Sequence, residues 1–446
     1  MKIKKILSAT AAVLFMSAFA AMPVQAVDKT QLEDEELTDG TFTFENINGS
    51  YTITKCDPTA IIETIPEFRN GFPVTAIGDN ALSNCTFITK LTVPDSIKSI
   101  GDSAFAGCTS LKEVTLPKNI DVLSSGLFMG CTNLETVDIP DHVNKIESYT
   151  FYNCSKLKEV RLSGELATIE PMAFAECSSI NNIDASACGS YTFEDGILYN
   201  SSKTNIYRAS TDLKGDVYIS DTVSAIEPGA FSVCAGIEHL FLPISLNYIG
   251  EDAFGYCVNL KKIDFSEGLV NIDDIAFKNC TSLTALDLPT TLEKIGEGSF
   301  YNCTALSRVM IAEGTTSVGT GAFASCSALE QLTIPSSVTE IGENAFGFDL
   351  ANDGTYTPKE NFKLSVSSNS AGAKYARANK ISFSTYDKSI KTAAFIIVGV
   401  GLIILAVVFA VVLMIRSKKS ASSSVRKAKK LQQEKEEEEN YKKIVE

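Results

Sequence analysis

A 23-residue unit that recurs along the chain dominates the sequence. It is clearest over residues 276–298, AFKNCTSLTALDLPTTLEKIGEG. In this copy Leu283, Leu286 and Leu288 end in a period-two alternation that Pro289 closes, which predicts a short strand. A unit this short cannot enclose a core by itself, so its apolar side needs a neighbour of the same shape. The repeat therefore predicts a solenoid.

The regular spacing of the repeats is clearest at one aromatic position and one cysteine position. Successive copies of the aromatic position are separated by exactly one repeat length, except for a single much longer step from Phe174 to Phe231. The aromatic position is filled by Leu82, Phe105, Phe128, Phe151, Phe174, Phe231, Phe254, Phe277, Phe300, Phe323 and Phe346. Three positions later come Cys85, Cys108, Cys131, Cys154, Cys177, Cys234, Cys257, Cys280, Cys303 and Cys326. The period lies within the range of about 20 to 29 residues typical of leucine-rich repeats.

The consensus AFxxCxxLxxVxLPxxIxxIGxx resembles the BspA-like leucine-rich-repeat proteins, which are known mainly as bacterial cell-surface proteins. Residues 65–66 and 72–74 resemble the start of that family's arrays, and residues 371–383 resemble their end. The resemblance implies a binding or adhesion role at the cell surface. The partner would be an extracellular protein or glycan, such as a host matrix protein or another bacterium.

Within each unit, the residues after the cysteine, such as 111–117, should form one rung of a parallel sheet on the concave side. The Ile-Gly segment should form the opposite side, and the Ala-Phe-x-x-Cys piece a tight or helical turn. The expected fold class is thus a mainly β solenoid of leucine-rich repeats, with a parallel concave sheet, short helical turns and one transmembrane helix.

The long step holds an insert at about residues 185–219. Within it, Asp195-Gly196 separates two β-rich runs, residues 191–194 and 197–199, which is a hairpin signal. Insertions in solenoids fall on one face and often alter the binding surface. BspA-like arrays also commonly contain structural inserts, so both interpretations remain open.

Both ends of the chain predict membrane targeting. Residues 1–26 combine a basic start, an apolar stretch and a small-residue cleavage site, which indicates a secretory signal peptide rather than an uncleaved anchor. Residues 393–415 are uncharged and apolar over a length that spans a bilayer. The basic residues from Arg416 onward place the following tail in the cytoplasm, so the repeats should be extracellular on a single-pass membrane protein.

The expected organisation has six parts. They are a signal peptide (1–26), an N-terminal β cap (27–64), the solenoid (65–347), a C-terminal cap with a juxtamembrane linker (348–392), a transmembrane helix (393–415) and a cytoplasmic tail (416–446).

The charge distribution excludes some classes of partner. Of the formal charge of −15, the signal peptide carries +3 and the tail +4, so residues 27–415 carry −22. Such an acidic surface argues against nucleic acid as a partner and against lying on an anionic membrane.

The cysteines predict neither a disulfide framework nor a metal site. Because the ten periodic cysteines occupy the same inward site, neighbours stack with parallel Cβ directions, which is poor geometry for a disulfide. We expect a structural ladder of buried thiols, some donating to backbone carbonyls. Cys56 and Cys188 lie outside this ladder and several rungs apart, so a bridge between them is not expected. No close cysteine cluster suggests a metal, and no cofactor is expected.

No catalytic motif is present. The chain has two histidines, His142 and His239, and lacks H-E-x-x-H, G-x-S-x-G and a phosphate-binding glycine loop. We therefore expect a binding protein rather than an enzyme. The alternative is a structural or sensory envelope protein that couples surface contact to its cytoplasmic tail.

The candidate partner-binding residues are the outward positions of the rungs. Phe241 is an aromatic residue where other rungs have Thr, Asp or Arg, and aromatic residues dominate binding hot spots. Packing of Phe241 beneath the insert is an equally open interpretation. The full candidate set is His239, Phe241, Lys261, Arg308, Met310 and Arg161.

Overall fold

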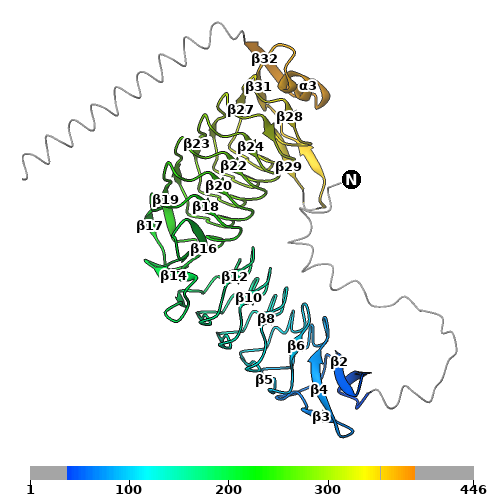
Figure 1. Cartoon of the computed structure of the whole chain (residues 1–446). Helices are drawn as coiled ribbons and strands as arrows, with labels where there is room; N and C mark the ends of the chain where they lie inside the picture. The colour runs from blue at the N-terminus through cyan, green and yellow to red at the C-terminus, as the bar shows by residue number, and fades with distance from the viewer. Residues whose placement is uncertain (1–37, 352, 387–446) are drawn as a thin grey trace, which may run out of the picture. The chain divides into compact units, whose positions relative to one another are not determined.

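The computed structural model describes residues 38–351 and 353–386 of the 446-residue chain. Almost all of them belong to the first of two compact units, Met1–Ser384, in which each 23-residue repeat makes one coil of a β-solenoid (Figure 1). The expected signal peptide, transmembrane helix and cytoplasmic tail lie outside the described residues. Within the described part, no helix is both long and apolar enough to span a membrane.

The residues that follow each cysteine form short parallel strands, which together make a surface called here the rung face. In β7 (Glu113–Thr115) the middle residue, Val114, is buried and its two neighbours are exposed, as alternation in a strand requires. The other rung-face strands are β5 (Lys90–Thr92), β9 (Thr136–Asp138), β11 (Glu159–Arg161), β13 (Asn182–Asp184), β17 (Gly215–Tyr218), β19 (Ile237–Phe241), β21 (Lys262–Asp264), β23 (Ala285–Asp287), β25 (Arg308–Met310), β27 (Gln331–Ile334) and β31 (Lys363–Ser367).

The Ile-Gly segments form a second set of parallel strands. A Cβ on Gly296 would lie 2.4 Å from the backbone of Asp273, so the absence of a side chain lets adjacent coils pack this closely. These strands are β6 (Ser99–Ile100), β8 (Val122–Leu123), β10 (Lys145–Ile146), β12 (Thr168–Ile169), β18 (Ala225–Ile226), β20 (Tyr248–Ile249), β22 (Asn271–Ile272), β24 (Lys294–Ile295), β26 (Ser317–Val318) and β28 (Glu340–Ile341).

The Ala-Phe-x-x-Cys segment is a tight turn and not a helix, which corrects the expectation of short helical turns. Residues two before and two after the phenylalanine are left-handed, as at Ile275 (φ 51°) and Asn279 (φ 60°) around Phe277. Left-handed residues do not continue an α-helix. Because no helix forms, the N–H groups of the turn donate to carbonyls of the next coil. For example, Phe277 N donates to the carbonyl of Ser299 at 2.7 Å.

Two ladders of identical side chains fill the interior. The phenylalanine rings stack, as in the Phe254–Phe277 and Phe277–Phe300 pairs, whose centroids are 5.0 and 5.2 Å apart and whose planes are nearly parallel. All twelve cysteines are buried and unbridged. Eight thiols donate to the carbonyl 26 residues earlier at 3.1–3.3 Å: Cys108, Cys131, Cys154, Cys177, Cys257, Cys280, Cys303 and Cys326.

Non-repeat elements cover both ends of the described array. At the N-terminal end, an antiparallel pair, β1 (Phe42–Ile47) and β2 (Ser50–Cys56), joins β4 (Phe72–Ile77), which also pairs with β3 (Phe68–Arg69). At the other end lie β29 (Phe348–Leu350), β30 (Tyr356–Pro358), α3 (Ala371–Ala378) and β32 (Ser382–Tyr386). The Tyr375 ring packs edge-on against Phe346 and its hydroxyl donates to the Phe346 carbonyl at 3.0 Å, which ends the phenylalanine ladder.

The insert is part of the solenoid. The expected hairpin is present as β14 (Tyr191–Glu194) and β15 (Ile197–Asn200), with positive φ at both Asp195 and Gly196. The next strand, β16 (Asn205–Ala209), pairs in parallel with β18, and β17 pairs in parallel with β19. The insert thus adds β17 to the rung face and β16 to the second set of strands. The β14–β15 hairpin lies beside β16, at the edge of that second set.

A buried arginine joins the coils on the two sides of the insert. The side chain of Arg208 is 0% exposed. Its guanidinium donates to the carbonyls of Cys177 (2.8 Å), Gly229 (3.1 Å) and Ser232 (3.1 Å). Burial raises the pKa of the Cys177 and Cys234 thiols to about 11, although the positive charge of Arg208 opposes this rise. Arg208 therefore satisfies carbonyls where the regular coil-to-coil contacts are interrupted.

The phenylalanine ladder predicts a large effect of truncation. Phe277→Ala should lower the free energy of unfolding by about 3 to 5 kcal/mol, because a fully buried ring leaves a cavity. Urea unfolding followed by circular dichroism measures this change. The matched control is Phe87→Ala, which removes a ring that is 54% exposed and should change stability by less than about 0.5 kcal/mol. Equal effects of the two substitutions would contradict the prediction.

Arg208→Met should weaken the junction at the insert. It removes the guanidinium donor from three carbonyl oxygens, of which those of Gly229 and Cys177 also accept from backbone N–H groups, so the main cost is about 1 to 3 kcal/mol for the buried carbonyl of Ser232. Because repeat arrays depend on nearest-neighbour interfaces, we expect urea unfolding to separate into two transitions. Arg161→Met, on an exposed arginine, is the control and should retain the wild-type curve. A single transition with an unchanged midpoint for Arg208→Met counts against this role.

The thiol ladder should resist alkylation in the folded protein. Burial raises the pKa of Cys131, Cys154 and Cys257 well above the ordinary value, and only the thiolate is nucleophilic. Iodoacetamide at neutral pH should leave these cysteines unmodified in the native state and modify them after denaturation, as measured by peptide mass spectrometry. Rapid native labelling at these positions would show that the ladder is accessible.

Candidate binding surface on the rung face

Charged side chains on the rung face pair with each other between adjacent coils. The repeat spacing puts Lys90 beside Glu113, with the charged atoms 2.9 Å apart, and Lys261 beside Glu238 at 2.6 Å. Such exposed ion pairs contribute about 0 to 1 kcal/mol each. A ligand with charged groups can therefore replace one partner of such a pair at little cost in free energy.

Three of the candidate residues take part in these pairs. Lys261 pairs with Glu238 as above, and Arg308 binds Asp287 through two hydrogen bonds of 2.5 and 2.9 Å. Arg161 lies 3.2 Å from Asp141 and 3.8 Å from Asp138. All three are partly exposed, and their charges are balanced by acidic groups of this same chain.

On the rung face, Tyr218, His239 and Phe241 form a cluster of aromatic rings in contact, called here the aromatic platform. Tyr218 of β17 and Phe241 of β19 are register partners, and their rings stack with centroids 4.3 Å apart. The centroids of His239 and Phe241 are 3.9 Å apart. Tyr218 is 67% exposed, so the outer side of the platform is open to solvent.

Charged groups border the platform on the next rung. The Nε2 atom of His239 lies 3.1 Å from a carboxylate oxygen of Asp264, and Nζ of Lys262 lies 2.7 Å from the other oxygen. Asp264 is also the register partner of Phe241. The platform thus combines an apolar stacking surface with a charged donor and acceptor beside it, which suits a ligand with both apolar and polar parts.

The structure brings together only part of the candidate set. His239, Phe241 and Lys261 lie on neighbouring coils, whereas Met310 and Arg308 are on β25, beyond β21 and β23. At about 4.8 Å per rung, Met310 is roughly 14 Å along the face from Phe241. Arg161 lies on β11, on the other side of the insert.

Sequence reasoning missed Tyr218, which is the most exposed ring of the platform. It lies inside the insert, where the repeat motif is absent. Counting one repeat period back from Phe241 leads to Tyr218, so the repeat register continues through this part of the insert. That count was the signal available in the sequence.

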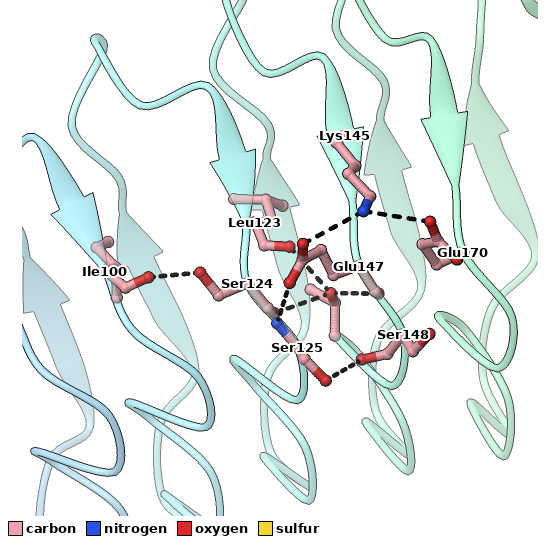
Figure 2. A network of polar contacts seen from close by, with 9 residues as sticks. Ile100, Leu123, Ser124, Ser125, Lys145, Glu147, Ser148 and Glu170 are labelled. Carbon is pink, nitrogen blue, oxygen red and sulfur yellow. Dashed lines mark hydrogen bonds and ion pairs between the residues drawn. The ribbon is translucent and has the colours of Figure 1, made fainter.

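The second set of strands presents a different surface, on which polar groups satisfy one another (Figure 2). Lys145 Nζ lies 3.3 Å from a carboxylate oxygen of Glu147 and 3.2 Å from one of Glu170, and these two contacts raise its pKa. The hydroxyl of Thr150 donates to the carbonyl of Glu147 at 2.7 Å, and Ser125 N donates to the Glu147 carboxylate at 3.1 Å. This network stabilises coil stacking and leaves fewer groups available for a ligand.

The described residues contain no group of three or more His, Cys, Asp and Glu side chains arranged to hold a metal ion.

Comparisons with known proteins give the fold and the family. A leucine-rich-repeat protein from Eubacterium ventriosum is 21% identical, with a TM-score of 0.52 over 72% of this chain and 98% of that one. A leucine-rich cell surface protein from Faecalibacterium prausnitzii is 26% identical over 69% of this chain and 94% of the other, with a TM-score of 0.48. The first likeness supports the solenoid fold. No curated protein sequence matches the chain significantly.

The sequence profile of the BspA type leucine-rich-repeat region (6 copies) matches residues 75–205 and 224–350. These two segments cover more than half of the chain, and the gap between them contains the end of the insert. Together with the repeat spacing and the solenoid, this match shows that the chain belongs to the BspA-type leucine-rich-repeat family.

Proposed function

We propose that this protein is a cell-surface binding protein that holds an extracellular protein or glycan on its rung face, with the aromatic platform at the centre of the contact. The platform is the observation that carries the proposal, since aromatic side chains dominate binding hot spots. A stacked Tyr218–Phe241 pair is also stiff, so little side-chain entropy is lost when a ligand covers it.

The location of the protein is the second part of the proposal. A similar solved protein is described as a leucine-rich cell surface protein. The apolar segment 393–415 would anchor the chain, with the repeats outside and the tail in the cytoplasm. The acidic repeat region then faces cationic or neutral partners, such as a host matrix protein, a glycan or the surface of another bacterium.

Binding by cells tests this function directly. Cells displaying the full chain are compared with otherwise identical cells lacking it, for retention on surfaces coated with matrix proteins or glycans and for adhesion to other bacteria. The proposal expects the chain to increase retention on at least one surface, with or without residues 416–446. If no surface responds while deletion of 416–446 alters a cellular phenotype, the protein is instead a sensory envelope protein acting through its tail.

Truncation of the platform should weaken the binding so detected. Phe241→Ala and Tyr218→Ala should each raise the Kd by about 30-fold, which corresponds to a hot-spot loss of about 2 kcal/mol. Equilibrium binding of the identified ligand to cells displaying each variant gives the comparison. Phe87→Ala removes an exposed ring outside the platform and should leave the Kd unchanged. If all three variants bind alike, the ligand does not use the platform.

A further inference from the structure

Large polar residues near the insert occupy left-handed positions that Gly, Asn or Ser fill in several other coils. Asp252 (φ 53°) precedes Phe254 by two residues, and Tyr256 (φ 60°) follows it by two. Glu176 (φ 58°) is the corresponding residue after Phe174. The left-handed backbone at these positions belongs to the turn that the other coils also make, so it is the chemistry of the three side chains that sets this part of the array apart.

The side chains of Lys278, Asp252 and Glu176 form a triad in which Lys278 and Asp252 are buried and Glu176 is partly exposed. Nζ of Lys278 lies 3.2 Å from Oδ1 of Asp252 and 3.6 Å from Oε1 of Glu176. The exposed fractions of the three side chains are 9%, 0% and 20% respectively. Asp252 and Lys278 come from adjacent coils, and Glu176 reaches the site from the other side of the insert.

The carboxyl group of Asp252 has Lys278 as its polar partner. Beyond Lys278, neither of its buried oxygens accepts a hydrogen bond from another described group. Space for the group comes from Gly255, where a Cβ would lie 1.7 Å from Oδ1 of Asp252. Burial raises the pKa of Asp252 to about 7, although Lys278 opposes the rise. An ion pair alone would leave these oxygens poorly satisfied.

Aromatic side chains shield the triad from water. The ring centroid of Tyr256 is 5.1 Å from Nζ of Lys278. Tyr152 is 7% exposed, and burial together with the charge of Glu176 raises its pKa. Burial lowers the pKa of Lys278, but the carboxylates of Asp252 and Glu176 outweigh this and raise it. A dry site that fixes an amine beside a carboxyl group raises their effective concentration by many orders of magnitude.

We propose that Nζ of Lys278 and the side-chain carboxyl of Asp252 condense to an isopeptide bond, with Glu176 transferring the protons. The lysine ammonium loses a proton to Glu176, and the neutral amine attacks Cγ of Asp252. The C–N bond forms, one carboxyl oxygen takes up protons and leaves as water, and Glu176 returns to its carboxylate form. The ammonium and carboxylate become one amide and one water, so no oxidant or other reactant is needed.

The bond would join the adjacent coils of Phe254 and Phe277 covalently, one coil beyond the insert. It is independent of the proposed ligand and would resist unstacking of the coils under force or denaturant. It also accounts for the presence of a lysine at a position, one after the phenylalanine, that is Ala106, Ala175 or Ala324 in other coils.

Mass spectrometry of the full chain tests this proposal. After denaturation and trypsin digestion, the wild type should give residues 215–261 joined to residues 263–294, lighter by one water than the two peptides together. The second peptide stays uncut at Lys278 because trypsin does not cleave after an acylated lysine. Recovery of the separate, unmodified peptides 215–261 and 263–278 from the wild type would overturn the proposal, and this readout needs no variant.

A set of variants tests the role of each group. Asp252→Ala and Lys278→Met should abolish the joined peptide. Glu176→Gln should reduce it at least tenfold while the circular dichroism spectrum of the fold is retained. Glu135→Gln changes an exposed glutamate in the same way and should leave the joined peptide at the wild-type level. An undiminished joined peptide in Glu176→Gln would overturn the assignment of Glu176, and its persistence in Asp252→Ala would overturn the proposed bond.

Discussion

Every coil of this protein depends on the coil before it and the coil after it. A single repeat cannot bury its phenylalanine ring or provide hydrogen-bond acceptors for the N–H groups of its turn. The adjacent repeats cover the ring and supply the acceptors. Phe277 stacks between Phe254 and Phe300, and its N–H donates to Ser299 of the next coil. Because the repeat spacing is strict on each side of the insert, identical side chains of adjacent coils stack and form ladders there.

The regular part of this structure follows from the repeat alone. The phenylalanine and cysteine positions, the rung strands and the Asp195-Gly196 hairpin were predicted because each rests on local pattern or on one fixed period. The turn was harder to predict, because Ala-Phe-x-x-Cys is compatible with a helix. The frequent Asn or Gly immediately before the cysteine, as at Gly107 and Asn279, was the available sign of a left-handed residue.

The contacts around the insert did not follow from the sequence. Arg208 binds Cys177 and Ser232, and Glu176 reaches Lys278, across the interruption of the period. A sequence pattern shows which residues share a repeat, but not which distant residues meet where a repeat is missing. The aromatic platform is a partial exception: Phe241 stood out as an aromatic rung residue, while its stacking partner Tyr218 did not.

The repeat also indicates where specific function can arise. Side chains that recur in every coil are committed to stacking, so a new role has to use positions that depart from the consensus. Such departures concentrate around the insert, with Tyr218, His239 and Phe241 on the rung face and Asp252 and Lys278 among the turns. A rigid array suits this arrangement, because adjacent coils hold exposed rings and buried reactive groups at fixed separations. The interruption of the period, where the buried residues divide into two core clusters, is therefore the part of the chain near which binding and cross-linking groups can arise without disturbing the regular ladders.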